Sequence, residues 1–524
     1  MMSKNNKFTN AKIRWDMKFL KLFFSRAIPI LISIAIQVFL IMAVNLYLTK
    51  HETIINTIFA IFGVLVFFTL VTKDQPATYK LPWVIIILVF PFFGIMMYLL
   101  FGDSRLSRKY GKQFRANLHE RKKQLEQSQK TLEKLKQISS IGYGQAEYIQ
   151  KSAMLTIHEN TFTEYLNLGE KFFLKLIDEL KKAKKYIFME YFIIEKGVMW
   201  NEIYSILRQK TKEGIEVYFI YDDVGCITRL NSCFYKQMRK DNINCIVFNP
   251  FRPIVSIIHN NRDHRKLTVI DGEKGFIGGT NIADEYINIK KPYGVWKDSA
   301  IFLEGQGVDN LVKLFISMYN PFSKQKLDVK DFIVEHRTNY ENGFVLPFGT
   351  GPKYLYGEYV GENIYANIIN QSKKYVYITS PYLVIDTPLL NALKVAATRG
   401  VDVRIILPHI PDKKIMHILA KSNYPYLIKA GVKIYEFIPG FIHSKTFVCD
   451  DEIAVVGTIN LDYRSLIHHF ECGVWMYNTK SVKELYDDYN KILTNSMLIS
   501  KENTKLKWHQ NIVKKIMSIF TPLF

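Results

Sequence analysis

The 524-residue sequence has few cysteines and lacks several common cofactor motifs. Its cysteines are an odd number without paired spacing, which argues against a disulfide framework: Cys226, Cys233, Cys245, Cys449 and Cys472. No Gly-x4-Gly-Lys-Ser/Thr loop is present, so nothing in the sequence predicts a nucleotide cofactor. No His/Cys group has the spacing of a metal site either. The sequence therefore predicts a reaction without cofactor or metal.

Charge is missing from three stretches near the N-terminus. Residues 27–48, 54–71 and 81–101 contain no Asp, Glu, Lys, Arg or His. Each is long enough, or nearly so, to cross about 30 Å of hydrocarbon. Three such runs in succession predict N-terminal transmembrane helices rather than buried core helices. A cleaved signal peptide is disfavoured because the basic leader of residues 1–26 precedes the first run and no small-residue cleavage site follows it.

The basic flanks of this membrane region predict its topology only in part. Both the leader and the segment after residue 101 are basic and favour the cytoplasm, which three full crossings cannot satisfy. The run 81–101 contains Pro91 and Gly94, which weaken a continuous helix, so it is the candidate for a re-entrant or interfacial segment. We expect a multi-pass protein of the cell membrane whose catalytic region faces the cytoplasm.

Negative charge is scarce relative to positive charge. There are 70 Lys and Arg against 48 Asp and Glu, a net charge of +22. Such an excess suits nucleic acid or an anionic membrane surface. The hydrophobic runs favour the membrane, so anionic lipid is the predicted partner and nucleic acid is not. The sequence leaves the oligomeric state open.

Beyond the membrane region the chain contains a long internal repeat. Residues 102–140 are charged and predict a solvated helix or a linker. Segments 184–194 and 373–385 resemble each other as strands, and 207–221 parallels 393–407 as a helix, a glycine stop and a strand. This order indicates βαβ units and an α/β fold with two homologous halves, 141–348 and 349–500. Residues 501–524 predict an amphipathic helix that lies on anionic lipid or packs on the catalytic region.

The repeat carries one octapeptide twice. HRKLTVID at 264–271 and HSKTFVCD at 443–450 share the pattern His-x-Lys-x4-Asp. The two copies also share a Gly and an Asn at matching offsets, and together their fixed residues are His264, Lys266, Asp271, Gly278 and Asn281, then His443, Lys445, Asp450, Gly457 and Asn460. One match carries a real false-positive risk, whereas two copies with the same offsets indicate two half-sites of one centre.

Two imidazoles can divide a phosphodiester exchange between them. One attacks phosphorus to give a phosphohistidine, and the other protonates the leaving alkoxide and then deprotonates the incoming alcohol. Histidine suits both roles because its unperturbed pKa of about 6.5 leaves either protonation state accessible. Lys266 and Lys445 would neutralise the phosphate oxygens, and Asn281 and Asn460 would donate hydrogen bonds to them. On a strand, His and Lys at i and i+2 share a face, and the residue between them points away.

These motifs and their flanks resemble the bacterial cardiolipin synthases of the phospholipase D superfamily. The resemblance rests on NRDHRKLTVIDGEKGFIGGTNIADEY (261–286), VWKD (295–298), YEFIPGFIHSK (435–445) and GTINLDYRS (457–465). It implies two phospholipase D-like halves related by a pseudo-two-fold axis and sharing one active site. It also implies transfer of a phosphatidyl group between two phosphatidylglycerol molecules, with cardiolipin and glycerol as products and no metal in the chemical step.

The resemblance also implies roles for single residues. His264 is the expected nucleophile and His443 the acid/base, but the near-symmetry of the two motifs leaves the reverse order open. Asp298 and Glu471 stand where the family has a carboxylate against each histidine. Asp271 and Asp450 belong to the motif and are expected among its catalytic residues, although direct contact with substrate does not follow from the sequence. The family's Asn before Phe-Glu is His469 here, Lys297 replaces an Arg, and a Gly-Ser step becomes Gly-Gly at 278–279 and Gly-Thr at 457–458.

Other functions remain open at this point. A hydrolase of the same superfamily would use water as the acceptor, because the sequence does not show whether the pocket excludes water. A lipid-binding scaffold without catalysis is disfavoured because both half-sites keep His and Lys. The acyl preference and the use of phosphatidylethanolamine do not follow from the sequence.

Overall fold

The structure is a computed structural model. It describes residues 39, 52–90, 93–95, 97–98, 102, 108–125, 129–231, 233–250, 261–338, 340 and 343–504, together with 508, 511, 514, 515, 517 and 518. The chain divides into an N-terminal unit that ends at Arg105 and a larger unit formed by Leu106–Pro250 and Asn260–Pro522. The predicted hydrophobic segment 27–48 lies outside the described residues except for Phe39, and so does most of the predicted C-terminal helix.

The N-terminal unit contains two described helices, α2 (Glu52–Thr72) and α3 (Ala77–Val89). The predicted segment 54–71 falls within α2, and 81–101 begins within α3. A small apolar core joins these helices and includes Leu70, Tyr79, Trp83 and Ile87. Among the residues described, no helix reaches the length and hydropathy that a membrane crossing requires. The transmembrane helices therefore remain a prediction.

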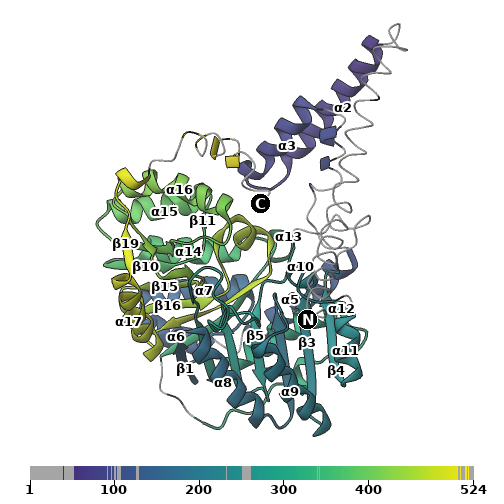
Figure 1. Cartoon of the computed structure of the whole chain (residues 1–524), viewed down its shortest axis with the longest axis vertical. Coiled ribbons are helices and arrows are strands. Elements are labelled where there is room, and N and C mark those ends of the chain that lie inside the picture. The colour runs from purple at the N-terminus through teal and green to yellow at the C-terminus, as the bar shows by residue number, and fades with distance from the viewer. Residues whose placement is uncertain are drawn as a thin grey trace, which may run out of the picture. The chain divides into compact units, whose positions relative to one another are not determined.

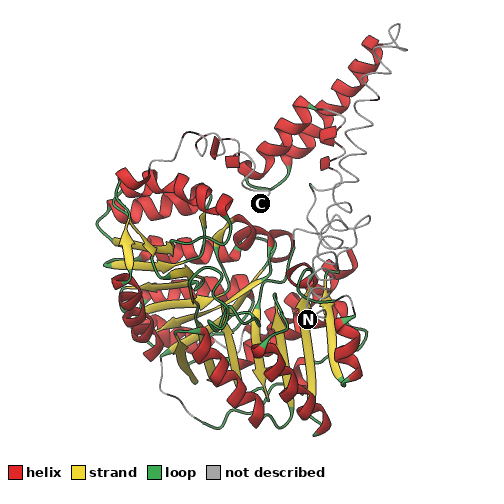
Figure 2. Ribbon diagram, viewed as in Figure 1, coloured by secondary structure: helices red, strands yellow, loops and turns green. Residues whose placement is uncertain are grey.

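The first half of the larger unit is a mixed sheet flanked by helices (Figures 1 and 2). Its sheet has the order β1-β8-β6-β5-β2-β3-β4, in which β2, β3 and β4 are parallel and the other pairs are antiparallel. The elements are β1 (Thr161–Leu166), α8 (Gly169–Lys182), β2 (Tyr186–Tyr191), α9 (Val198–Lys212), β3 (Glu216–Asp222), α10 (Asp223–Cys226), α11 (Phe234–Lys240), β4 (Ile243–Phe248), β5 (Lys266–Ile270), β6 (Lys274–Gly278), β7 (Val295–Lys297), β8 (Ala300–Gly305), α12 (Val308–Phe322) and the short helix Val329–Asp331.

The second half repeats this plan. Its sheet has the order β19-β13-β12-β10-β15-β16-β18-β9, with β10, β12 and β13 parallel. The elements are β9 (Phe344–Thr350), α13 (Lys353–Tyr356), α14 (Val360–Gln371), β10 (Tyr375–Thr379), β11 (Leu383–Val384), α15 (Thr387–Thr398), β12 (Asp402–Pro408), α16 (Lys414–Lys429), β13 (Lys433–Phe437), β14 (Gly440–Ile442), β15 (Thr446–Cys449), β16 (Ile453–Gly457), β17 (Leu461–Asp462), the π-helix Arg464–His468, β18 (Glu471–Tyr477), α17 (Lys480–Thr494), β19 (Ser496–Leu498) and the short helix Glu502–Thr504.

Matching strands occupy matching places in the two sheets. Central strands β2 and β10 are buried along their whole length, as expected where helices cover both faces of parallel strands. Gly214 follows α9 with φ +84° and Gly400 follows α15 with φ +97°, which is the left-handed conformation that ends a helix. The predicted helix, glycine stop and strand are therefore confirmed in both halves, and the fold consists of two α/β halves with mixed sheets.

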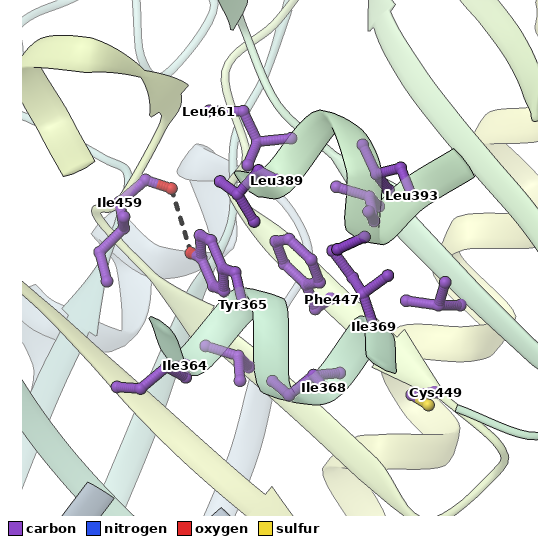
Figure 3. Close-up of a cluster of buried hydrophobic side chains, with 14 of the residues drawn as sticks. Ile364, Tyr365, Ile368, Ile369, Leu389, Leu393, Phe447, Cys449, Ile459 and Leu461 are labelled. Atoms are coloured by element: carbon purple, nitrogen blue, oxygen red, sulfur yellow. Dashed lines mark hydrogen bonds between the residues drawn. The ribbon is translucent and has the colours of Figure 1, made fainter. Parts of the chain in front are cut away.

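The core of the second half shows how packing positions a site residue. Helix α14 inserts Tyr365 against Phe447 of β15, with ring centroids 4.0 Å apart (Figure 3). The Tyr365 hydroxyl donates a 3.1 Å hydrogen bond to the Ile459 carbonyl (Figure 3). Because Asn460 follows Ile459 directly, this apolar core fixes the backbone on which a predicted site residue stands.

The described parts of the charged segment 102–140 form two helices that pack on the larger unit. It contains α5 (Arg108–Gln124) and α6 (Gln129–Ile138). Phe114 of α5 stacks on Phe470 with ring centroids 5.0 Å apart, and Leu132 and Leu135 of α6 are buried in the core of the second half. The expectation of a solvated helix or linker is therefore corrected: apolar side chains of both helices pack on the two halves, and Arg121 of α5 is buried as well.

The boundaries of the two halves also differ from the predicted ones. Helix α7 (Ser140–Ala153) was expected to open the first half, yet its Ala146, Ile149 and Ala153 are buried in the core of the second half. Strand β9 crosses the expected boundary at 348/349 and pairs with β18 of the second sheet. The second half therefore takes its edge strand from residues before 349, because a strand belongs to the sheet that satisfies its backbone groups.

Candidate active site

A cleft of about 1380 Å³ is lined by residues of both halves of the larger unit. His264 lies two residues before β5 and His443 lies three residues before β15, and both side chains line this cleft. Each histidine residue is only 8% exposed. The two copies of the motif therefore contribute to one site, as their repetition predicted.

His264 is held by a carboxylate of the opposite half. Its Nδ1 lies 2.9 Å from Oε1 and 3.0 Å from Oε2 of Glu471. The same carboxylate accepts hydrogen bonds of 2.5 Å from the hydroxyls of Thr458 and Ser465. These contacts fix the imidazole with Nδ1–H toward Glu471, which leaves Nε2 available for chemistry.

His443 has the same arrangement in reverse. Its Nδ1 lies 2.7 Å from Oδ2 of Asp298, which belongs to the first half. The other carboxylate oxygen accepts a 2.8 Å hydrogen bond from the backbone N–H of Ser299. The sequence placed a carboxylate against each histidine, and the structure adds that each carboxylate comes from the other half.

Backbone hydrogen bonds between the halves set this register. The His264 N–H donates to the Phe470 carbonyl at 2.9 Å, and the His443 N–H donates to the Lys297 carbonyl at 2.7 Å. Each acceptor immediately precedes the carboxylate residue, Glu471 or Asp298. Strands β7 and β14 pair in parallel at the second junction. The site therefore forms only where the halves meet.

Burial determines the protonation state of both histidines. The pKa of His443 is lowered to about 4, chiefly by burial and then by Lys445, while Asp298 opposes the shift. The pKa of His264 is well below its usual value, chiefly because of burial and then because of Lys266 and Lys445. Burial alone would raise the pKa of Asp298, but His443 and Lys445 hold it below its usual value. The histidine–carboxylate contacts are therefore hydrogen bonds of neutral imidazoles in the free protein.

Each motif lysine donates a hydrogen bond to the backbone of its own histidine. Lys266 Nζ contacts the His264 carbonyl, and Lys445 Nζ contacts the His443 carbonyl. Burial lowers the pKa of Lys266 to about 8 and that of Lys445 to about 7, with nearby carboxylates opposing both shifts. Two buried ammonium groups without a full set of counter-charges suit an anionic ligand.

The motif aspartates lie elsewhere. Asp271 accepts hydrogen bonds of 2.6–3.0 Å from the backbone N–H groups of residues 184–186, at the start of β2. Asp450 accepts the equivalent bonds of 2.7–2.9 Å from residues 373–375, before and at the start of β10. Neither residue lines the cleft. We therefore correct the expectation that they are catalytic: their contacts anchor a central strand in each half.

The supporting asparagines and glycines have different surroundings. Asn281 lines the cleft, accepts a 2.9 Å bond from the Ile193 N–H and donates a 2.7 Å bond to the Tyr286 hydroxyl. Asn460 also lines the cleft. A Cβ at Gly278 would lie 2.5 Å from Ala300, and one at Gly457 would lie 2.4 Å from the Cys472 carbonyl. Both glycines therefore permit close packing of neighbouring strands rather than direct contact with phosphate.

The residue after each of these glycines explains one departure from the family pattern. A Cβ at Gly279 would lie 2.1 Å from Oδ1 of Asp298, so only glycine leaves room for that carboxylate. Thr458, at the equivalent place, instead donates its hydroxyl to Glu471. Glutamate is one carbon longer than aspartate, which accords with a glycine at position 279 beside Asp298 and a threonine at position 458 beside Glu471.

Several residues around the histidines were not predicted as part of the site. The rings nearest His264 are Phe192, at 4.9 Å, and His469, at 5.7 Å between centroids. The rings around His443 lie at 5.3–5.9 Å and belong to Tyr286, Trp296 and Phe441. Trp296 and His469 lie in segments that the sequence had marked, but single residues such as Phe192 carry no signal without the fold.

One group has the donor chemistry of a metal site. Among the described residues, His264, His469 and Glu471 offer ligand atoms within 4.8 Å of one another. Two imidazoles and a carboxylate are a set that zinc accepts. In this structure Glu471 already accepts hydrogen bonds from His264, Thr458 and Ser465, and the motif lysines lower the affinity of the site for a cation. The geometry favours the hydrogen-bonded arrangement.

The comparisons with known proteins match this geometry. The family model described as cardiolipin synthase, phospholipase D-like domain, matches residues 176–304 and again 365–493, one match in each half. A second model, the N-terminal region of phospholipase D nucleases, matches residues 57–102. A cardiolipin synthase of Halalkalibacterium halodurans is 31% identical over 92% of this chain and 98% of its own length.

This chain belongs to the cardiolipin synthase family of the phospholipase D superfamily. It is accordingly an enzyme of the phosphatidyltransferase type. An uncharacterized protein of Streptococcus mutans is 40% identical over 87% of this chain and 98% of its own length. The crystal structure of a phosphatidylserine synthase of Haemophilus influenzae aligns with 72% of this chain and 98% of its own, with a TM-score of 0.55 and 15% identity, which supports the fold. The family resemblance seen in the sequence is thus confirmed.

Proposed function

We propose that this enzyme transfers a phosphatidyl group from one phosphatidylglycerol molecule to the terminal hydroxyl of another, giving cardiolipin and glycerol. The observation that carries the proposal is the pair of neutral imidazoles in one cleft, each held through Nδ1 by a carboxylate of the opposite half. This leaves two Nε2 atoms for a two-step exchange at phosphorus.

In the first step His264 Nε2 attacks phosphorus and the bond to the glycerol headgroup breaks. The leaving alkoxide takes a proton from His443, and a phosphohistidine remains. In the second step His443 accepts the proton of the incoming hydroxyl, whose oxygen attacks phosphorus and releases His264. Bonds and protons balance without a nucleotide. His443 must be protonated first, and a bound phosphodiester anion favours this because it raises the pKa of a neighbouring imidazole.

Lys266 and Lys445 would stabilise the charge on the non-bridging phosphate oxygens. Their depressed pKa values support an anion as the missing counter-charge. Asn281, whose amide is engaged by Ile193 and Tyr286, would shape the phosphate site with Asn460. Glu471 and Asp298 would orient the two imidazoles.

We also propose that the enzyme acts at the cell membrane, with its catalytic region on the cytoplasmic side. The three uncharged segments of the sequence and their basic flanks support this placement. The match of residues 57–102 to a known N-terminal region agrees with a segment that family members share.

The test uses the purified full-length protein with phosphatidylglycerol vesicles in H₂¹⁸O, without nucleotide or added metal. We expect cardiolipin and glycerol by mass spectrometry, with no ¹⁸O in the cardiolipin phosphates. The double variant His264→Ala/His443→Ala is the control and should give neither product. Phosphatidic acid carrying ¹⁸O as the main product would instead identify a hydrolase.

A further inference from the structure

Three loops, each taken together with the adjoining end of a strand or helix, form a rim at the cleft. They are residues 288–295 of the first half and 409–416 and 437–440 of the second, and we call them the cleft rim. The Val295 N–H donates a 2.9 Å hydrogen bond to the Pro439 carbonyl, and the His409 N–H donates a 3.2 Å bond to the Phe437 carbonyl. Residues 437–440 are therefore hydrogen-bonded to both of the other segments, and their bond to Val295 crosses the junction of the halves.

Two of these loops line the cleft that holds the catalytic histidines. The first contributes residues 290–293 to the cleft wall, and the second contributes residues 412–416. Because Lys291, Lys413 and Ile415 line the cleft and are exposed, the rim borders an opening of the cleft to solvent. A lipid headgroup would reach the site from here while its acyl chains stayed outside.

The cleft rim exposes large apolar side chains, which are unfavourable in a loop that faces only water. Four isoleucines lie at its surface: Ile289 is 53% exposed, Ile410 38%, Ile415 46% and Ile438 44%. Each loop also contains a proline, which restricts the backbone and lowers the entropy lost when a loop becomes ordered against a partner: Pro292, Pro411 and Pro439.

The charges interleaved with these isoleucines are mainly positive. The lysines of the rim are exposed: Lys290, Lys291, Lys413 and Lys414. Lys290 pairs with Glu195 at 2.6 Å, whereas Asp412, the one carboxylate within the three loops, accepts a 2.7 Å bond from the Tyr382 hydroxyl. Basic and apolar side chains side by side match the boundary between anionic headgroups and acyl chains.

We propose that the cleft rim docks on an anionic lipid bilayer, with its isoleucines in the interfacial layer and its lysines on lipid phosphates. This contact is additional to any anchoring by the N-terminal segments. It would place the cleft mouth against the membrane, so that a headgroup enters the site without the lipid leaving the bilayer. Its partner is the lipid surface itself rather than a protein, because the rim combines lysines suited to anionic headgroups with isoleucines suited to acyl chains.

The test places an environment-sensitive fluorophore on single cysteines in the full-length protein. The background carries Cys233→Ser, because Cys233 is exposed and the other four cysteines are buried. Ile415→Cys and Ile289→Cys report on the rim. Val395→Cys is the matched control: Val395 is 57% exposed in the last turn of α15, which leads to the amino end of β12, whereas the rim follows the carboxyl end of β12.

The labelled proteins are placed in nanodiscs that contain phosphatidylglycerol, with or without acyl-chain spin labels. We expect blue-shifted emission and quenching for the labels at 289 and 415 but not for the label at 395. Replacing Lys291 or Lys414 by Gln should lower the ratio of docked to undocked protein about fivefold for each lysine. Circular dichroism checks that each variant is folded.

Labels at 289 and 415 that stay as exposed to water as the label at 395 would overturn the proposal. The fluorescence signal needs no turnover, so this result is independent of whether the enzyme makes cardiolipin. As a second measurement, the variant Ile410→Asp/Ile438→Asp, at two exposed rim positions outside the cleft lining, should lose activity on bilayers yet keep its activity on a monomeric short-chain phosphatidylglycerol. An equal loss on both substrates would also contradict docking.

Discussion

The two half-sites share an imidazole, a lysine and a carboxylate from the opposite half, but the residue between His and Lys differs. In the first half it is Arg265, which is buried, lies 4.0 Å from Glu190 and donates a 3.3 Å bond to the Glu471 carbonyl. In the second half it is Ser444, whose hydroxyl lies 3.1 Å from that of Thr379. The first motif therefore holds a buried charge between its histidine and its lysine, and the second holds a neutral hydroxyl.

This difference shows that the two half-sites are alike in their histidines, lysines and carboxylates but differ in the buried residues next to them. Burial raises the pKa of Glu190 well above its usual value, with Arg265 opposing, and it raises the pKa of Asp263 to about 6. Arg265 also lies over the Phe470 ring, 5.7 Å from its centroid, next to the Glu471 backbone. The backbone of Glu471, the carboxylate residue that holds His264, therefore adjoins a buried charged network around Arg265, whereas Lys297, next to Asp298, forms a separate buried ion pair with Asp488.

The largest expected effect separates the roles of the histidines. His264→Ala and His443→Ala should each lower turnover by at least about 10³-fold. With phosphate-labelled phosphatidylglycerol and an alkaline quench, a base-stable phosphoprotein should form in His443→Ala but not in His264→Ala. The reverse result would assign the nucleophile to the second half.

The next comparison concerns the exchanged carboxylates. Glu471→Gln and Asp298→Asn keep the size of each side chain but remove its negative charge and replace one acceptor oxygen by an NH₂ donor. Each imidazole then loses the partner that fixes its tautomer, so kcat should fall about 10²- to 10⁴-fold with little change in KM. Glu471→Gln should mainly slow phosphoprotein formation, and Asp298→Asn should slow its breakdown as well. Glu362→Gln, a buried carboxyl outside the cleft lining, is the control. Equal effects on both steps in both variants would argue against distinct roles.

A third comparison measures the buried network itself. Arg265→Met should lower the free energy of unfolding by about 3–5 kcal/mol, because it leaves buried carboxyl groups without their cation. Ser444→Ala should cost only about 1 kcal/mol, the usual worth of one hydrogen bond. Thermal unfolding of both variants provides the measurement, and Glu190→Leu added to Arg265→Met should recover part of the loss. Similar costs in the two halves would show that the network carries little energy.

The smallest effect concerns pH. Lys445 loses its proton as the pH rises through about 7 and Lys266 through about 8, so kcat/KM should fall above these values as the phosphate loses its counter-charges. Arginine stays charged throughout this range. In Lys445→Arg the alkaline decline, scaled to the variant's own maximum, should begin about one pH unit later because Lys266 then governs it. An unshifted decline would mean that another group controls it.

Much of the fold could be predicted from the sequence. The glycine stops at Gly214 and Gly400 and the apolar segments that became β2 and β10 are local signals, and both were found where expected. The helices between residues 102 and 140 were predicted as solvated because their charges dominate the composition. Their few apolar residues, such as Phe114 and Leu135, decide the packing. A narrow apolar stripe in the sequence does not show which part of the protein the helix will pack against.

The candidate site shows the same division between local signals, which the sequence carries, and long-range contacts, which it does not. The sequence named His264 and His443, and it named the two carboxylates as well. It did not say that Glu471 serves His264 and Asp298 serves His443, because that pairing depends on strands that meet across the junction of the halves. The motif aspartates looked catalytic by association, but their partners are backbone N–H groups that only the folded chain brings within reach.

The sequence by itself determined which groups this protein brings to its candidate site. These are a histidine and a lysine, repeated at fixed offsets in two α/β halves, without a cofactor motif. Residue types and spacings suffice for that, because they are local properties of the chain. Only the tertiary structure decided which groups touch. Burial lowered the pKa values of the histidines and lysines, and the junction of the halves exchanged the carboxylates and gathered isoleucines and lysines on the cleft rim. These properties depend on residues far apart in the chain, and so they arise only when both halves have folded together.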